Sequence, residues 1–261
     1  MKKKLNPSSS HFLSQKFWRI MRKILDRNTW SYLYIISQKM KLPSKLNLIK
    51  NNDLNIISNL KYPKIRKVKK SKNKFNNYLV KYKSSKPKGN YRKFLNSFFK
   101  KIKTPKTILE LGISEAAGLL AMRDYFSNSL LWGVDIDRAT FIKGKRIVNC
   151  GYCNQLELHS IKKILKKFNT KFDLIVDDGW HHPESQINSI LSCLPYLNEG
   201  GTYITEDIVH DSYKNYFYRL IELLKNKGFK VNYKTFHISD QKSNLVGTFN
   251  NGYLIIYRKS Q

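Results

Sequence analysis

Several residue types are scarce in this sequence, and each shortage excludes a class of protein. Three cysteines in 261 residues are too few for a disulfide scaffold, and an odd number leaves at least one free. With 12 glycines and 7 prolines, the chain is not collagen-like. No run of about 18 uncharged apolar residues occurs, so we expect no transmembrane helix. The first 30 residues lack the compact apolar core of a signal peptide, so we expect a cytoplasmic location.

The residues that are plentiful are typical of a folded protein. Hydrophobic residues make up 41% and aromatic residues 13% of the sequence, which excludes a wholly disordered chain. The chain is long enough for one α/β domain with an appendage.

Acidic residues are also scarce: 18 Asp and Glu stand against 49 Lys and Arg, which gives a formal net charge of +31. Such a charge indicates a polyanionic partner, either nucleic acid or an anionic membrane surface. However, 39 of the basic residues are Lys and only 10 are Arg, which is the better phosphate ligand. An A/T-biased coding sequence would produce the same composition without any binding partner. Both interpretations stay open at this point.

The charge is unevenly distributed along the chain. Residues 1–106 have a net charge of +28, whereas residues 107–261 have a net charge of +3. We expect residues 1–60 to form a basic amphipathic helical arm, which either packs on the main domain or lies on a membrane surface. The Lys-, Ser- and Asn-rich residues 61–90 are typical of a flexible or extended linker. Residues 91–261 are expected to form the main domain.

Strand-like and helix-like segments alternate regularly from Tyr91 onward. This alternation predicts an α/β fold with a Rossmann-like, mostly parallel sheet of seven strands, helices on both faces and a C-terminal antiparallel hairpin. The expected helices are Tyr91–Ile102, Glu115–Phe126, Leu156–Lys167, Pro183–Leu197 and Asp211–Lys227. The expected strands are Thr107–Gly112, Leu130–Asp135, Arg146–Tyr152, Phe172–Asp177, Gly201–Thr205, Lys230–His237 and Gly252–Arg258.

The ends of the first two strands are suited to a nucleoside-containing cofactor. Gly112 allows a tight turn that brings backbone N–H groups close to a ligand. Asp135, 23 residues later, is placed to accept hydrogen bonds from ribose hydroxyls. The second and third glycines of the nicotinamide-binding fingerprint are missing, so this is a different kind of cofactor site.

Paired carboxylates follow two further strands, and they predict a metal site. Asp178 follows one apolar strand, and Glu206 and Asp207 follow the next strand along the chain. Clustered carboxylates repel one another unless a cation lies between them or protons are taken up. Oxygen ligands favour a hard ion, with Mg²⁺ as the first expectation. A hydroxyl bound to such an ion is more acidic, and His181 is the expected general base, with His182 as the alternative.

These motifs resemble two related groups of proteins. The Glu110-to-Gly112 turn with the later Asp135 resembles the class I S-adenosylmethionine-dependent methyltransferases. The run from Asp177 to His181, together with Glu206 and Asp207, resembles the Mg²⁺-dependent O-methyltransferases that modify sugars on macrolides, a group that includes rhamnosyl methyltransferases and cephalosporin hydroxylase-like proteins. The resemblance covers about half of the chain, from about Tyr91 to Tyr213.

The resemblance implies a set of site residues and cofactors. It implies S-adenosylmethionine and Mg²⁺ as cofactors, with a small-molecule or glycan acceptor. Asp178 would act with His181 in catalysis, and the metal ligands would be Asp178, Glu206 and Asp207. The implied cofactor-binding residues are Glu110, Gly112, Ser114, Asp135, Asn154, Gln155 and Asp177.

The sequence departs from the family pattern at three places near this site. Ala116-Ala117-Gly118 stands where the family usually has Gly-Gly-Ser, which alters the loop expected at the methionine end of the cofactor. Asn154 replaces an Asp beside the expected adenine position, and Trp180 replaces a Ser beside the reaction centre. These changes are expected to reshape the cofactor and acceptor pockets.

The sequence therefore predicts a Mg²⁺-assisted O-methyltransferase that acts on a sugar hydroxyl. Two alternatives remain: an RNA methyltransferase that uses the basic arm to hold RNA, and a non-catalytic protein with a methyltransferase-like fold that docks on RNA or on a membrane.

Overall fold

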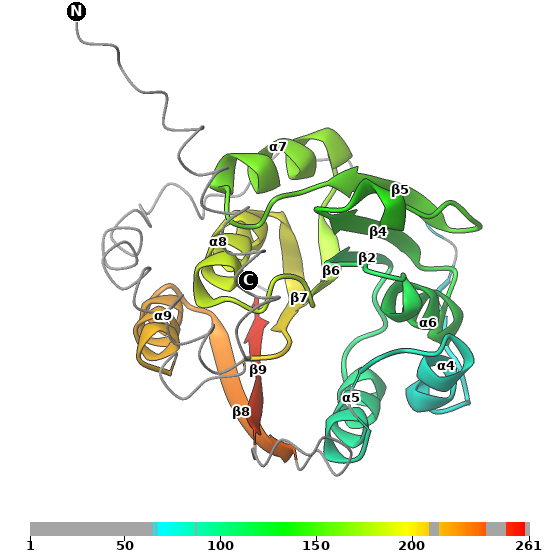
Figure 1. Cartoon of the computed structure of the whole chain (residues 1–261), viewed down its shortest axis with the longest axis horizontal. Helices are drawn as coiled ribbons and strands as arrows, with labels where there is room; N and C mark the ends of the chain where they lie inside the picture. Colours follow the sequence, from blue (N-terminus) through cyan, green and yellow to red (C-terminus); the bar gives the residue numbers. More distant parts are fainter. Residues whose placement is uncertain (1–64, 66, 87, 209–213, 239–248, 259–261) are drawn as a thin grey trace, which may run out of the picture. The chain divides into compact units, whose positions relative to one another are not determined.

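The computed structural model describes residue 65 and residues 67–86, 88–208, 214–238 and 249–258 (Figure 1). The arm expected over residues 1–60 lies outside the described residues. No helix within the described ranges is long and apolar enough to cross a bilayer.

A seven-stranded sheet forms the centre of the domain, as the sequence predicts. Its spatial order is β5-β4-β2-β6-β7-β9-β8. The first five strands of this order run parallel, and β9 pairs antiparallel with both β7 and β8. The strands are β2 (Thr107–Leu111), β4 (Leu130–Asp135), β5 (Ile147–Tyr152), β6 (Phe172–Asp177), β7 (Leu197–Thr205), β8 (Lys230–Ile238) and β9 (Phe249–Tyr257). A separate two-stranded sheet joins β1 (Lys69–Lys70) to β3 (Phe126–Ser127).

Helices cover both faces of the sheet (Figure 1). One group consists of α4 (Phe75–Lys81), α5 (Asn90–Lys101) and α6 (Ala117–Tyr125). The other group consists of α7 (Leu158–Phe168), α8 (Pro183–Cys193) and α9 (Lys214–Asn226), with short 3-10 turns at Arg138–Thr140 and Leu194–Tyr196. All five residues of β2 are buried, because a central parallel strand is covered on both faces.

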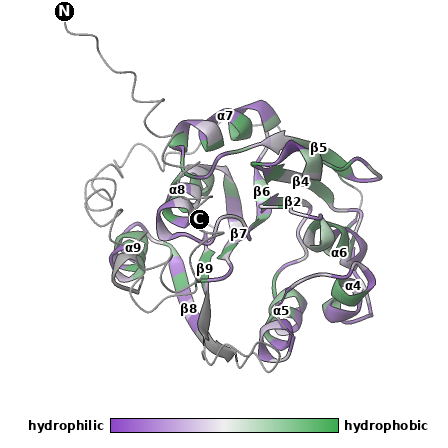
Figure 2. Ribbon diagram, viewed as in Figure 1, coloured by the Kyte–Doolittle hydropathy of each residue, from purple (hydrophilic) through white to green (hydrophobic). Residues whose placement is uncertain are grey.

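Amphipathic patterning explains why these segments pack as they do, and Figure 2 shows the apolar colouring of the central strands. In α7 the buried side chains are Ile161, Ile164, Leu165 and Phe168, at helical spacing. The lysines between them are exposed.

The prediction of a flexible or extended linker over residues 61–90 is wrong for the part of this range that the structure describes. Helix α4 lies within it and buries Phe75 and Leu79, four residues apart, in the main core. The ring of Phe75 contacts Phe99 and Tyr125 at centroid distances of 4.5 and 5.5 Å. A low local helix preference is overridden here, because docking these apolar side chains stabilises the helix.

One helix ends earlier than the sequence pattern indicates. The helix expected over Pro183–Leu197 ends at Cys193, and β7 begins at Leu197 rather than at Gly201. Pro195 has no N–H to continue the helical ladder, so the chain turns through a short 3-10 segment into the strand.

The strand order places a topological switch point at the end of β2. The chain passes from β2 to β4 and β5 on one side and then crosses to β6 on the other, and ligands bind at such a switch point in open α/β sheets. Gly112, directly after β2, has φ +81°. A Cβ built at Gly112 would lie 2.2 Å from Gly179 Cα, so the backbones after β2 and β6 approach each other closely.

Substitution of Gly112 tests this close approach. We expect Gly112→Ala to lower the free energy of unfolding by at least about 2 kcal/mol, because it adds left-handed strain to a backbone clash. Gly144→Ala is the matched control, because Gly144 has no positive φ and its nearest new contact is Arg123 Nη1 at 3.8 Å. Its change should stay within about 0.5 kcal/mol. Urea unfolding of both variants measures the difference, and equal stability would contradict the close approach.

Candidate active site

Three carboxylates meet at the carboxyl ends of β6 and β7. Asp177 of β6 is in register with Thr205 of β7, so the residues that follow them lie side by side. The N–H of Asp178 donates to Leu111 O at 2.9 Å, and the N–H of Glu206 donates to Asp177 O at 2.8 Å. These bonds extend the sheet pairing by one residue beyond each strand, as expected for acids at adjacent strand ends.

The cluster contains a lysine that sequence reasoning missed. Lys86 Nζ lies 2.5 Å from Asp178 Oδ2 and 2.6 Å from Glu206 Oε2. The Lys86 side chain is only 8% exposed and Glu206 is 1% exposed. Burial alone would lower the pKa of the ammonium, but the two carboxylates outweigh it and raise the pKa above its usual value. Burial in turn raises the pKa of Glu206.

The backbone around Lys86 is held by Arg92 of α5. Arg92 Nε donates to Lys86 O at 3.0 Å, and Arg92 Nη2 donates to Ser84 O at 2.8 Å. The arginine is itself 7% exposed. The loop between α4 and α5 is therefore fixed to the domain at the residue that carries the ammonium.

Tyr91, at the start of α5, joins the two acids that follow β7. Its hydroxyl lies 3.0 Å from Glu206 Oε2 and 2.8 Å from Asp207 Oδ1, so it donates between them. Burial raises the pKa of Tyr91 well above its usual value, which keeps the hydroxyl protonated as a donor. Tyr91 is not among the site residues that the sequence predicts.

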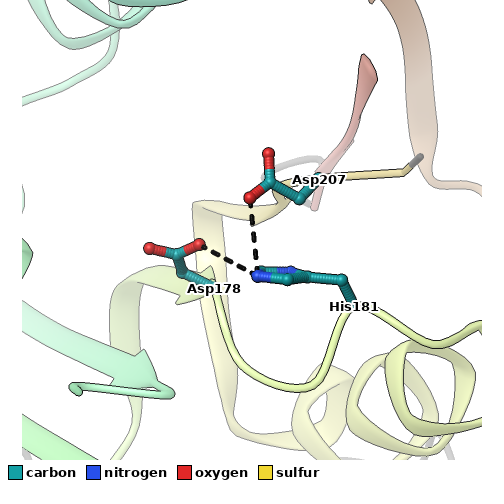
Figure 3. Close-up of side chains that lie close together, drawn as sticks. All are labelled: Asp178, His181 and Asp207. Carbon is teal, nitrogen blue, oxygen red and sulfur yellow. Dashed lines mark ion pairs between the residues drawn. The ribbon is translucent and has the colours of Figure 1, made fainter. Parts of the chain in front are cut away.

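His181 lies beside two of the acids, Asp178 and Asp207 (Figure 3). Its Nε2 is 3.4 Å from Asp207 Oδ2 and 4.0 Å from Asp178 Oδ1. One ligand atom from each of these residues lies within 4.8 Å of the others, so this trio is a candidate metal site among the described residues. The grouping includes the imidazole in place of the expected Glu206.

His182, the alternative base, lies at the start of helix α8, where it acts as the N-cap. Its Nδ1 accepts the N–H of Glu184 at 3.4 Å and caps the start of α8. Burial lowers the pKa of His182 to about 3, so the ring is neutral. His181 is therefore the histidine that the structure brings to the acids.

The expected cofactor residues at β2 and β4 lie around the first loop. Asp135 Oδ2 accepts the N–H of Ser114 at 2.9 Å, which ties the loop to the end of β4. Glu110 is buried, its Oε2 has no hydrogen-bond partner among the described residues, and burial raises its pKa well above the usual value. A Cβ at Gly118 would lie 2.3 Å from Glu110 Oε1, so the lack of a side chain at Gly118 makes room for this carboxylate.

The other expected cofactor residues make internal hydrogen bonds. Asp177 is buried and accepts from Gln155 Nε2 at 2.7 Å and from the Tyr203 hydroxyl at 3.0 Å. Gln155 Oε1 accepts the N–H of Trp180 at 2.8 Å. Asn154 Nδ2 donates to Glu157 Oε1 at 2.9 Å. The network supports the loop that carries Asp178 and His181, and cofactor contact by these side chains stays a prediction.

Removal of one donor to Asp177 tests this support. We expect Tyr203→Phe to destabilise the protein by about 1–3 kcal/mol, because a buried acceptor loses its partner. Burial raises the pKa of Asp177 from 3.8 to about 6, against the two donated hydrogen bonds.

The effect of this substitution should depend on pH. The pKa of Asp177 is higher in the folded than in the unfolded protein. The stability that depends on its protonated form is therefore full below about pH 4 and is lost as the pH rises through about 6, where the carboxyl ionises. Tyr203→Phe should therefore cost more at pH 7.5 than at pH 5. Tyr152→Phe, at a side chain that is 41% exposed, is the control. Equal losses at both pH values in chemical unfolding would contradict the predicted role of Tyr203.

No family model matches the chain. Part of it is similar to curated sugar O-methyltransferases of Streptomyces. It is 28% identical over 109 residues to 8-demethyl-8-alpha-L-rhamnosyl tetracenomycin-C 2'-O-methyltransferase of Streptomyces olivaceus. This match covers 39% of this chain and 28% of that protein. It is also 31% identical over 110 residues to L-olivosyl-oleandolide 3-O-methyltransferase of Streptomyces antibioticus. This second match covers 38% of this chain and 27% of that protein. The match thus spans little more than a quarter of each relative.

The fold is similar to that of the MycE methyltransferase from the mycinamycin biosynthetic pathway, solved in complex with Mg and SAH. The TM-score is 0.55 at 15% identity, over 73% of this chain and 55% of that one. The chain therefore has the fold of this methyltransferase, and part of its sequence is similar to sugar O-methyltransferases.

Proposed function

We propose that this protein is an S-adenosylmethionine-dependent O-methyltransferase that acts on a hydroxyl of a sugar or glycosylated small molecule, with the aid of a divalent cation. The observation that carries the proposal is the position of Asp178, Asp207 and His181. They lie together at the carboxyl edge of a methyltransferase-type sheet, beyond the Gly112 turn. The similarity to sugar O-methyltransferases supports the class of acceptor.

The residues of the first loop fit S-adenosylmethionine. The buried Glu110 Oε2 lacks a donor within the part of the chain that the structure describes, and it suits a ligand that supplies one. Asp135 is partly exposed at the end of β4, where an acid accepts ribose hydroxyls in related sheets. The positive φ of Gly112 lets the chain turn sharply at the strand end where such a ligand would bind.

The acids beside His181 fit a divalent cation, with Mg²⁺ as the first candidate. Asp178 Oδ1 and Asp207 Oδ2 face the imidazole, and Lys86 and Tyr91 bind the other oxygen of each acid. Glu206 would join them only through Oε1, because its Oε2 contacts both Lys86 and Tyr91. A bound cation would supply Lewis acidity, which lowers the pKa of a coordinated hydroxyl.

The chain's own contribution to the reaction is positioning and proton removal. His181 Nε2 accepts the proton of the acceptor hydroxyl, while Asp178 and Asp207 stabilise the imidazolium that results. The hydroxyl oxygen forms a bond to the methyl carbon as the carbon–sulfur bond breaks. Since the sulfonium is already reactive, orientation of the two substrates supplies most of the acceleration.

Neither alternative function is favoured. The curated relatives named above act on glycosylated small molecules by their names, and none is named as acting on RNA. The arm that would hold RNA or a membrane lies outside the described residues.

Two measurements on the full chain test the proposal. Calorimetry should show S-adenosylmethionine binding by the wild type and, within about threefold, by Asp178→Asn, because Asp178 is not expected to contact the cofactor. Turnover on a panel of glycosylated acceptors with Mg²⁺ should fall at least about 100-fold in Asp178→Asn. Glu199→Gln, which removes an exposed acid in β7, is the control and should keep full activity.

The outcomes are distinct. No detectable binding of S-adenosylmethionine would favour a non-catalytic protein. Full activity of Asp178→Asn in the presence of a chelator would exclude the role of the cation.

A further inference from the structure

The acidic cluster already contains a cation of its own. Lys86 Nζ bridges Asp178 Oδ2 and Glu206 Oε2 at 2.5 and 2.6 Å, and the lysine and Glu206 are both buried. Three carboxylates at adjacent strand ends require a counter-charge or protons. The lysine supplies one positive charge from the chain itself, shared by Asp178 and Glu206.

The oxygens of the cluster divide into two sets. Asp178 Oδ2 and Glu206 Oε2 contact the ammonium, whereas Asp178 Oδ1 and Asp207 Oδ2 face His181 Nε2. An ion between Asp178 and Glu206 would need the place that Nζ occupies. An ion beside His181 would not.

The lysine is anchored at that place. Arg92, itself buried, donates to the carbonyls of Lys86 and Ser84. Tyr91 binds the same Glu206 oxygen as the ammonium. Withdrawal of Lys86 would leave Glu206 buried with one donor and would expose Asp178 and Glu206 to mutual repulsion.

We propose that Lys86 is a resident cation of the active site that removes Glu206 from the metal-ligand set and confines a divalent cation to the Asp178 and Asp207 oxygens that face His181. This proposal rests on the proposed function for the identity of the site. It differs from the ligand set expected from the sequence, which includes Glu206. Lys86 is a positioning residue, because it acts through Asp178 rather than on the acceptor.

Divalent-cation affinity, measured by titration with Mn²⁺ and electron paramagnetic resonance, tests the proposal without any need for turnover. We expect Lys86→Met to raise Mn²⁺ affinity at least tenfold, because the Asp178–Glu206 position becomes available to the ion. We expect Lys86→Arg, which keeps the charge, to stay within threefold of the wild type. Lys81→Met is the matched control for loss of a positive charge in the same segment, since Lys81 pairs with Asp124 and its side chain is 57% exposed.

A double-variant cycle tests whether Glu206 causes the gain in Mn²⁺ affinity expected for Lys86→Met. Glu206→Gln should change Mn²⁺ affinity less than threefold when Lys86 is present, and it should abolish the gain when combined with Lys86→Met. Unchanged or weaker Mn²⁺ affinity in folded Lys86→Met would overturn the proposal. So would a tenfold loss on Glu206→Gln alone, a measurement that does not require Lys86→Met to fold.

Thermal unfolding gives a second readout. The rise in melting temperature on addition of Mg²⁺ should be at least 5 °C larger for Lys86→Met than for the wild type, because the variant gains a ligand for the ion. An equal or larger rise in the wild type would contradict the proposal. Loss of methyl transfer with these metal results intact would count against the proposed function and not against the role of Lys86.

Discussion

Repulsion among carboxylates at the ends of β6 and β7 is the constraint on which the rest of the site depends. The parallel pairing of these strands forces Asp178 and Glu206 side by side, whatever their charge. Like charges in a buried place are tolerated only with a partner cation and satisfied hydrogen bonds. Lys86 provides the cation and Tyr91 donates a hydrogen bond. The segment that contains these two residues, far from the acids in the sequence, is thereby part of the site.

Helix α4 and the loop after it are needed to satisfy this constraint, because they position Lys86. Helix α4 docks Phe75 and Leu79 in the core, and Arg92 holds the loop that follows it. The apolar contacts thus stabilise the loop that places the ammonium of Lys86. A region that is Lys-rich by composition contributes one lysine whose position matters, while its neighbours Lys81 and Lys83 are not buried.

Much of the fold could be predicted because it depends on local patterns. Strand and helix periods, the turn at Gly112 and the acids after the strands are visible in the sequence, and parallel strands necessarily bring their carboxyl ends to one edge. The errors arose where tertiary contacts decide. A helix stands in place of the expected linker because the core accepts Phe75. His182 caps α8 although it is adjacent to His181.

The sequence by itself determined the order of the elements, the cofactor turn and the presence of acids at one sheet edge, because each depends on residue types at short spacing. Only the tertiary structure decided which side chains neutralise and orient those acids. Lys86 is one of 39 lysines and has no local mark that separates it from the others. Its role arises from a contact with Glu206 across 120 residues of chain, and a pairing of that kind is set by packing rather than by pattern.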